Sequence, residues 1–234
     1  MSEGGDGRAS VDAAAEAATP NPAASAELVR GPTVEEIRAA MARHRPEKYP
    51  ALGRAAAVLV PLLPGPDGVV NVLFTKRSEK LSTHRGQVSF PGGAIDPTDA
   101  TAIDGALREA REEVGLDPAH VEVLGVLDDC PTFVTGFVIT PVVGLIDPRH
   151  FTSGGRYPWI PSAAEIDKLH ELPLAEFCDP RNSRIELREV SGTEFQLYWF
   201  TVQGTTIWGA TARILQGLIE LSLGLPSTIQ RPLP

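Results

Sequence analysis

Residues 100 to 114 carry the strongest local pattern in this sequence, and the pattern predicts one helix. Gly115 follows as a left-handed terminator, and Pro118 lies where a helix cannot continue. At about 100° of rotation per residue, one stripe of this helix is apolar. The stripe consists of Ile103, Leu107, Ala110 and Val114, and roughly opposite it lie Glu109, Glu112 and Glu113. One face of the helix is therefore acidic.

The acidic face is a candidate metal site. Like charges four residues apart, at Glu109 and Glu113, cost a helix a few tenths of a kcal/mol (roughly 0.2–0.5), and the pair Arg108 and Glu112 recovers a similar amount. Oxygen-only ligands clustered in this way suit a hard divalent cation such as Mg²⁺ or Mn²⁺, which bridges protein carboxylates to substrate phosphate. The alternative is a solvated surface, the usual role of a glutamate-rich helix face.

The segment before this helix is basic and rich in turns. Gly86, Pro91, Gly92 and Gly93 allow tight turns and let backbone N–H groups approach an anion closely. The cationic or titratable side chains of the segment are Arg77, Lys80, His84 and Arg85. In a chain of net charge -9, such an island suits a phosphorylated ligand. An ordinary surface loop is the alternative, and a histidine alone at position 84 is more often structural than catalytic.

The remaining segments predict helices and strands in irregular alternation. A helix is expected to begin at the N-cap Thr33 and to end before Pro46. Strands are predicted at 55–63, 69–75, 121–127, 137–146, 185–190 and 198–202, and helices at 165–172 and 211–223. Without a regular β-α-β period, these elements indicate a mixed α/β fold in a single domain, residues 31–234. Residues 1–30, rich in Ala, Gly and Pro, are predicted to form a flexible tail.

Composition narrows the class of protein and its partners. The 234 residues, 42% hydrophobic and 22% charged, are typical of one globular domain. The acidic balance argues against a nucleic-acid partner. Two cysteines favour a reducing compartment, and the longest aliphatic run, 55–63, is far shorter than the roughly 20 residues of a membrane span. We therefore expect a cytoplasmic protein without a membrane partner, and a homodimer as the commonest assembly.

The residues around the acidic helix resemble the Nudix box. That box is Gly, five residues, Glu, seven residues, then Arg-Glu-apolar-any-Glu-Glu-any-Gly-apolar. Residues 108–116, Arg-Glu-Ala-Arg-Glu-Glu-Val-Gly-Leu, match its second half at every position. In the first half, the expected glutamate falls on Ala100 and the expected glycine on Ala94, one residue after Gly93. Asp99 or Asp96 is the candidate replacement for the missing acid.

A second motif resembles the coenzyme A pyrophosphatase branch of the same family. Its pattern is Leu-Leu-Thr-any-Arg-Ser/Ala, three residues, Arg, three residues, Gly, three residues, Phe-Pro-Gly-Gly. Residues 73–78, Gly86 and residues 90–93 are similar to it at the right spacing, and Ser82 stands where the family has arginine. The resemblance extends from about residue 55 to residue 223.

The resemblance implies an α/β/α sandwich in which a mixed sheet carries a loop-helix-loop motif. It also implies a hydrolase that uses Mg²⁺ or Mn²⁺ to cut the diphosphate of coenzyme A or acyl-coenzyme A into 3′,5′-ADP and (acyl-)4′-phosphopantetheine. By position, Glu109, Glu112 and Glu113 match the metal-binding glutamates, Arg108 matches the arginine that orients them, and Gly93 matches the loop glycine.

Further candidates lie around this core motif. Glu165 is the candidate general base, because related enzymes often place a glutamate in that region; an ordinary acid at a helix start is the alternative. Tyr157 and Trp159 are candidates for stacking on adenine, or for packing. A nucleophilic role for Cys130 is disfavoured, because diphosphate hydrolysis requires no covalent step. Substrate contacts are expected from Arg77, Lys80, His84, Arg85, Gly92 and Gly93.

Two other functions remain open at this stage. One is hydrolysis of ADP-ribose, NADH or another dinucleotide with the same metal chemistry. The other is a Nudix-fold module that binds a nucleotide without hydrolysis, which the complete set of three glutamates disfavours. We also expect Glu113 to be exposed, so that Glu113→Gln leaves the fold intact.

Overall fold

The computed structural model describes residues 30–50, 53–65, 68–79, 86–132, 136–190 and 193–229. The tail predicted at the N-terminus therefore lies outside the described residues, apart from Arg30. Four residues singled out in the basic segment also lie outside them: Lys80, Ser82, His84 and Arg85.

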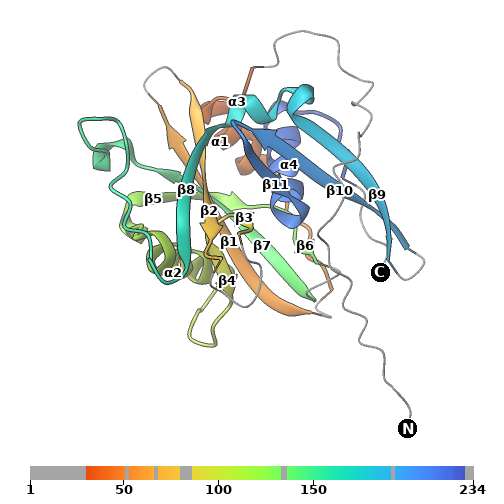
Figure 1. Ribbon diagram of the computed structural model, residues 1–234, viewed down its shortest axis with the longest axis horizontal. Helices are drawn as coiled ribbons and strands as arrows, with labels where there is room; N and C mark the ends of the chain where they lie inside the picture. The colour runs from red at the N-terminus through yellow and green to blue at the C-terminus, as the bar shows by residue number, and fades with distance from the viewer. Residues whose placement is uncertain are drawn as a thin grey trace.

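A mixed sheet forms the centre of the described structure (Figure 1). Its main path is β3-β2-β1-β7-β5, with β4 paired to β1, β6 to β7 and β8 to β2. The parallel pair is β1 with β7, and the other pairs are antiparallel. The strands are β1 (Arg54–Pro64), β2 (Val70–Arg77), β3 (Val88–Ser89), β4 (Gly92–Ala94), β5 (Val121–Val126), β6 (Cys130–Pro131), β7 (Phe137–Ile146) and β8 (Ile166–Pro173). The predicted mixed α/β class and the hairpin of β1 and β2 are confirmed.

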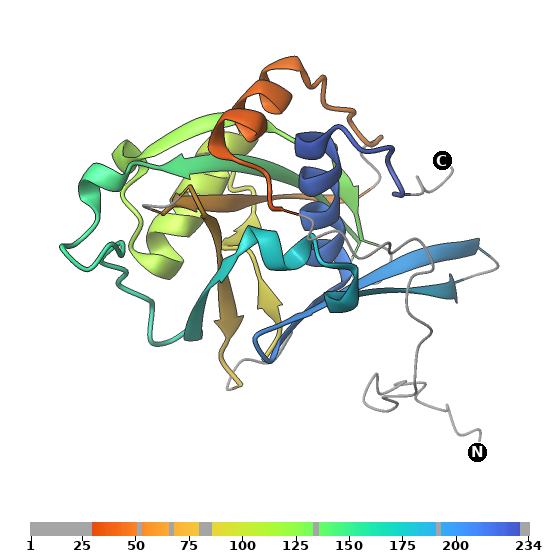
Figure 2. The same ribbon diagram turned by 90° about the horizontal axis from the view of Figure 1, so that it is seen from above.

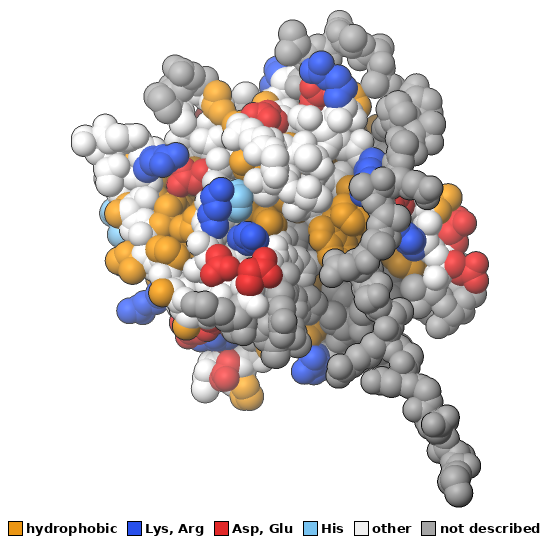
Figure 3. All heavy atoms as spheres, in the orientation of Figure 1, with side chains coloured by type: hydrophobic (Ala, Val, Ile, Leu, Met, Phe, Trp, Pro, Cys, Tyr) orange, Lys and Arg blue, Asp and Glu red, His pale blue; other side chains and the backbone are white. Residues whose placement is uncertain are grey.

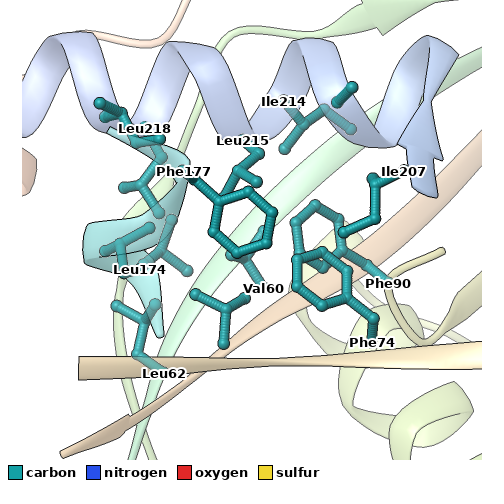
Figure 4. Packing of buried hydrophobic residues seen from close by; sticks show 14 of the residues in the cluster. Val60, Leu62, Phe74, Phe90, Leu174, Phe177, Ile207, Ile214, Leu215 and Leu218 are labelled. Atoms are coloured by element: carbon teal, nitrogen blue, oxygen red, sulfur yellow. The ribbon is translucent and has the colours of Figure 1, made fainter. Parts of the chain in front are cut away.

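Helices cover the two faces of this sheet (Figure 2). Helix α2 (Ala102–Val114) packs through its apolar stripe on one cluster of sheet residues, which includes Leu59 and Leu73. Helices α1 (Val34–Arg43) and α4 (Gly209–Leu223) and the short helix α3 (Leu174–Phe177) pack on the other cluster. Figure 4 shows that second core, where Leu215 and Leu218 of α4 lie over Val60 and neighbouring sheet residues. Alternate side chains of each strand thus fill two separate cores.

A second, three-stranded antiparallel sheet has the order β11-β10-β9. Its strands are β9 (Ser183–Val190), β10 (Thr193–Val202) and β11 (Thr205–Trp208). Tyr198, Phe200 and Ile207 of this sheet belong to the same core as α4. The strands predicted at 185–190 and 198–202 are therefore confirmed, with longer bounds.

The helix boundaries follow the signals in the sequence. At α1, Thr33 and Glu36 form a reciprocal capping box, as predicted. Helix α2 begins after the N-cap Thr101, two residues later than expected, and ends at Gly115, whose φ is +70°. That left-handed backbone conformation costs glycine little, which explains why α2 ends there.

The prediction of a helix at residues 165–172 is wrong. Residues 165–172 were expected to form a helix, but Ile166–Pro173 is strand β8. Strand β2 offers a partner along its length, and β8 pairs with it from Asn71 to Arg77. Because β2 satisfies the backbone hydrogen bonds of this segment, pairing overrides its weak helical periodicity. Glu165 consequently precedes a strand and not a helix, so the helix-start interpretation of its charge is also wrong. Within the described residues, no helix is long and apolar enough to cross a membrane.

Candidate functional site

Two glycines bring the chain between β3 and α2 close to its neighbours. Gly92 pairs with Val58 of β1, and a β-carbon on Gly92 would lie 2.4 Å from the Ala57 carbonyl oxygen. A β-carbon on Gly93 would lie 2.7 Å from the Glu109 carboxylate. Only glycine fits at these two positions without displacing backbone or carboxylate.

Glu113 is buried, contrary to the expectation of an exposed position, with 4% of its surface accessible. Its Oε2 accepts a hydrogen bond from the Gly92 N–H at 3.2 Å, and Arg77 Nη1 lies 3.8 Å from its Oε1. The glycine loop and β2 both approach this side of α2, which removes the carboxylate from water. The pKa of Glu113 is raised to about 7, chiefly by burial. The charges of Glu109 and Glu165 also raise it, whereas the Gly92 N–H and Arg77 lower it.

Arg108 organises the outer carboxylates of α2. Its guanidinium donates to both Asp99 oxygens at 3.0 Å, to Glu109 at 2.9 Å and to Glu112 at 3.2 Å. The Asp99 side chain is nearly enclosed, and the Arg108 guanidinium lowers the pKa of that carboxyl. Of the two acids considered for the missing box position, Asp99 therefore contacts Arg108, whereas Asp96 accepts from the backbone and hydroxyl of Thr98.

The three glutamates of α2 differ in exposure. The Glu112 side chain is 60% exposed, the Glu109 side chain 19%, and that of Glu113 is buried. Within the described part of the chain, no group of three or more His, Cys, Asp or Glu side chains is arranged to hold a metal ion by itself. Glu109 nevertheless lies close enough to Glu113 for its charge to raise the pKa of Glu113.

Glu165 approaches the same place from the start of β8. Its backbone carbonyl accepts a hydrogen bond from Ser78 at 2.8 Å, and its exposed side chain contributes to the raised pKa of Glu113. Arg77, Glu113 and Glu165 come from three separate segments of the sequence, and the fold brings them together. The predicted contacts Lys80, His84 and Arg85 lie outside the described residues.

The contacts of three other candidates, Tyr157, Trp159 and Cys130, indicate their roles. Tyr157 is 5% exposed, and its hydroxyl hydrogen-bonds with His120 Nδ1 at 2.8 Å and accepts from the Asp117 N–H at 3.2 Å. Its ring packs in the core under α2, so the packing interpretation holds. Trp159 Nε1 donates to Glu171 at 2.6 Å. Cys130 is buried, and burial raises the pKa of its thiol, which opposes a nucleophilic role.

A group of basic side chains on β2 and β8 was not predicted from the sequence. Lys76 and Lys168 are directly opposite each other in the β2–β8 register, and His170 is opposite Phe74. Figure 3 shows basic side chains and a histidine gathered over these strands, with acidic side chains next to them. Partial burial lowers the pKa of His170, and both lysines lower it further. An assignment of 165–172 as a strand would have revealed this group.

Comparisons with known proteins agree with the box. The NUDIX domain family matches residues 53–203. A relative from Klebsiella pneumoniae (strain 342), described as an uncharacterized Nudix hydrolase NudL, is 41% identical over 179 residues, which cover 75% of this chain and 86% of the relative. A NudL of the same description from Salmonella paratyphi B is 42% identical over 174 residues, which cover 74% and 84%.

Among solved structures, the Nudix hydrolase RenU from M. smegmatis matches 54% of this chain and 74% of its own, with 23% identity and a TM-score of 0.42. The family match covers more than half of the chain, and the NudL relatives align over three quarters of it. This chain therefore belongs to the NUDIX family of hydrolases.

Proposed function

We propose that this hydrolase cleaves the diphosphate of coenzyme A or acyl-coenzyme A to 3′,5′-ADP and (acyl-)4′-phosphopantetheine. The observation that carries the proposal is the 3.8 Å approach of Arg77 to Glu113. Arg77 belongs to the motif that resembles the coenzyme A branch, and Glu113 belongs to the Nudix box. A cation beside the buried carboxylate is suited to hold a diphosphate against the box.

The donor set fits a divalent cation such as Mg²⁺ or Mn²⁺. Magnesium is usually held by one or two carboxylates, several waters and substrate phosphates, so a closed cage of three side chains is not required. Burial is the main reason that the pKa of Glu113 is raised to about 7, and a divalent cation beside the carboxylate would favour its charged form. We assign Glu109 and Glu113 as inner ligands, with Glu112 as a third that must leave Arg108 to bind. When bound, the ion would polarise phosphoryl oxygens and lower the pKa of a bound water.

The remaining residues position the carboxylates and the substrate. Asp99 holds Arg108, which aligns Glu109, and Gly92 with Gly93 lets the loop backbone approach the phosphates. Arg77 neutralises phosphate charge, with Lys80, His84 and Arg85 as predicted further contacts. Glu165 accepts a proton from the attacking water. The water oxygen forms a bond to one phosphorus, and the bond from that phosphorus to the bridging oxygen breaks.

The test is product analysis by mass spectrometry after incubation with coenzyme A, with and without Mg²⁺ or Mn²⁺. Metal-dependent formation of 3′,5′-ADP and 4′-phosphopantetheine is expected. In ¹⁸O-labelled water, one product gains the label and identifies the phosphorus attacked. Intact coenzyme A under all metal conditions would overturn the substrate assignment.

A second candidate is hydrolysis of ADP-ribose, NADH or another dinucleotide, which Ser82 favours because an expected arginine is missing there. Comparing the turnover of coenzyme A with that of dephospho-coenzyme A separates the two functions. Faster turnover of coenzyme A is expected only if the enzyme has a binding site for the 3′-phosphate. Ligand binding without turnover of any diphosphate would instead indicate a non-catalytic nucleotide-binding module.

A further inference from the structure

Strand β9 forms an edge of the small sheet. Within the described residues, β10 is the strand that pairs with it. Figures 1 and 2 show β9 and β10 running outward past the helices and the large sheet. Ile185 and Leu187 lie on one face of β9 and are 43% and 58% exposed. An edge strand with exposed apolar side chains is a template for pairing with another strand.

The opposite face of β9 carries alternating charges. Arg184, Glu186 and Arg188 occupy successive positions on that face, and Glu186 contacts Arg184 at 3.2 Å and Arg188 at 2.7 Å. Charged edge residues normally prevent unwanted strand pairing. A positive-negative-positive series is different, because it is complementary to an antiparallel copy of itself in particular registers.

Only some registers satisfy this complementarity. When the twofold axis passes through Leu187, Glu186 faces Arg188 of the second copy, Leu187 faces Leu187 and Ile185 faces Glu189. When the axis passes through Glu186, like charges face each other at 186 and between 184 and 188. An axis between two residues would set side chains from opposite faces of the strand against each other, which a twofold-related antiparallel pair does not allow.

We propose that two copies of this chain associate through antiparallel pairing of β9 with β9, with the twofold axis at Leu187. The axis at Ile185 would also match charges, by pairing Arg184 with Glu186. However, it overlaps the strand only from 183 to 187, whereas the axis at Leu187 uses residues 184 to 190. The Leu187 axis also buries the more exposed of the two apolar side chains. The two small sheets become one continuous sheet.

The first test is sedimentation velocity of the full chain over a wide range of concentrations. We expect a concentration-dependent dimer, because a single strand pair buries less surface than a standard interface. Leu187→Lys places a charge on the axis and is expected to raise the dimer dissociation constant about ten-fold or more, since cross-strand pairs and their twofold copies change together. Val69→Lys is the matched control, because Val69 is 45% exposed and immediately precedes β2 in the large sheet.

Mixing of charge-reversal variants tests the register. Glu186→Arg and Arg188→Glu each place like charges across the axis, so each variant is expected to be monomeric. A mixture of the two is expected to form a heterodimer, because both cross-strand pairs become opposite in charge. In the Ile185 register, one of the corresponding pairs would remain Arg against Arg. Circular dichroism and melting temperature confirm that each variant is folded.

Three outcomes would overturn the proposal. The chain is monomeric at every concentration, the dimer is unaffected by Leu187→Lys, or mixed charge variants remain monomers. The first would leave β9 as a protected edge, the second would place the dimer contact on another surface, and the third would exclude the Leu187 register.

Discussion

The carboxylate of Glu109 lies against Gly93, where a β-carbon would approach it to 2.7 Å. Gly93→Ala therefore displaces the carboxylate from the position in which Arg108 holds it. We expect a loss of about a hundred-fold in kcat, since misplacement by about 1 Å can have this effect. Steady-state kinetics with Mg²⁺ measure the loss.

Gly154→Ala is the matched control for this substitution. A β-carbon on Gly154 would lie 3.7 Å from Thr152 Oγ1, which is an ordinary contact. The control is expected to retain wild-type turnover. Equal losses in both variants would show that the loss does not come from displacement of Glu109.

Glu113→Gln is expected to remove most turnover and to stabilise the metal-free protein at high pH. The folded pKa of Glu113 is about 7, above the ordinary value of 4.5, so the folded state favours the neutral acid. Wild-type stability therefore decreases as pH rises from about 4.5 to about 7, and the cost is fully present above that range. Above pH 7 the variant avoids that cost, about 3 kcal/mol in free energy of unfolding. Urea denaturation in EDTA at both ends of the range measures the difference.

Glu112→Gln is the control for this prediction, because the Glu112 side chain is 60% exposed and its carboxylate remains in contact with water. Its stability relative to wild type is expected to change little across the same pH range. If Glu113→Gln shows no gain at high pH, the carboxylate is not destabilised by burial.

The buried state of Glu113 shows the limit of prediction from this sequence. The helix and the division into an apolar and an acidic face follow from the spacing of residues such as Leu107 and Ala110, and the structure confirms the helix as α2. Exposure could not be inferred in the same way. It depends on Gly92, which lies 21 positions earlier and donates to Glu113 only because β4 pairs with β1. Long-range pairing of this kind leaves no local periodicity.

Asp99→Ala is expected to lower kcat about ten-fold. Asp99 holds two nitrogens of the Arg108 guanidinium at 3.0 Å, and Arg108 in turn contacts Glu109. Loss of an outer partner that orients a metal ligand typically has an effect of about ten-fold to a hundred-fold. Asp179→Ala removes a similar contact, with Arg181, on a separate loop, and is expected to leave kcat unchanged. A full loss in both variants would contradict an alignment role for Asp99.

Tyr157→Phe is expected to lower the free energy of unfolding by about 1 kcal/mol without changing kcat/KM. The substitution removes the hydroxyl that contacts His120 and Asp117, and leaves the Asp117 N–H without that acceptor. Chemical denaturation and steady-state kinetics test the two parts separately. A selective rise in KM with unchanged stability would favour contact with the adenine base instead.

The strand β8 explains why Glu165 was harder to interpret than the box. The spacing of Ile166, Leu169 and Leu172 is compatible with a helix, but Ile166 and Leu172 are buried as strand residues against β2. Glu165 is a candidate base because related enzymes often place a glutamate in that region, and not because of the local pattern. Pairing of β8 with β2 is what carries it toward Glu113.

Glu165→Gln tests whether this carboxylate takes the proton from the attacking water. The structural contact of residue 165 with Ser78 uses its backbone carbonyl, so the amide side chain is expected to leave the fold unchanged. A general base typically contributes about 10² to 10⁴ in rate, so kcat is expected to fall by at least about a hundred-fold with little change in KM. Asp167→Asn, two residues away, is the control and is expected to retain turnover. The pH profile of kcat should lose its acidic limb in Glu165→Gln only. A parallel loss in both variants, or an intact profile in Glu165→Gln, would assign the proton to another group.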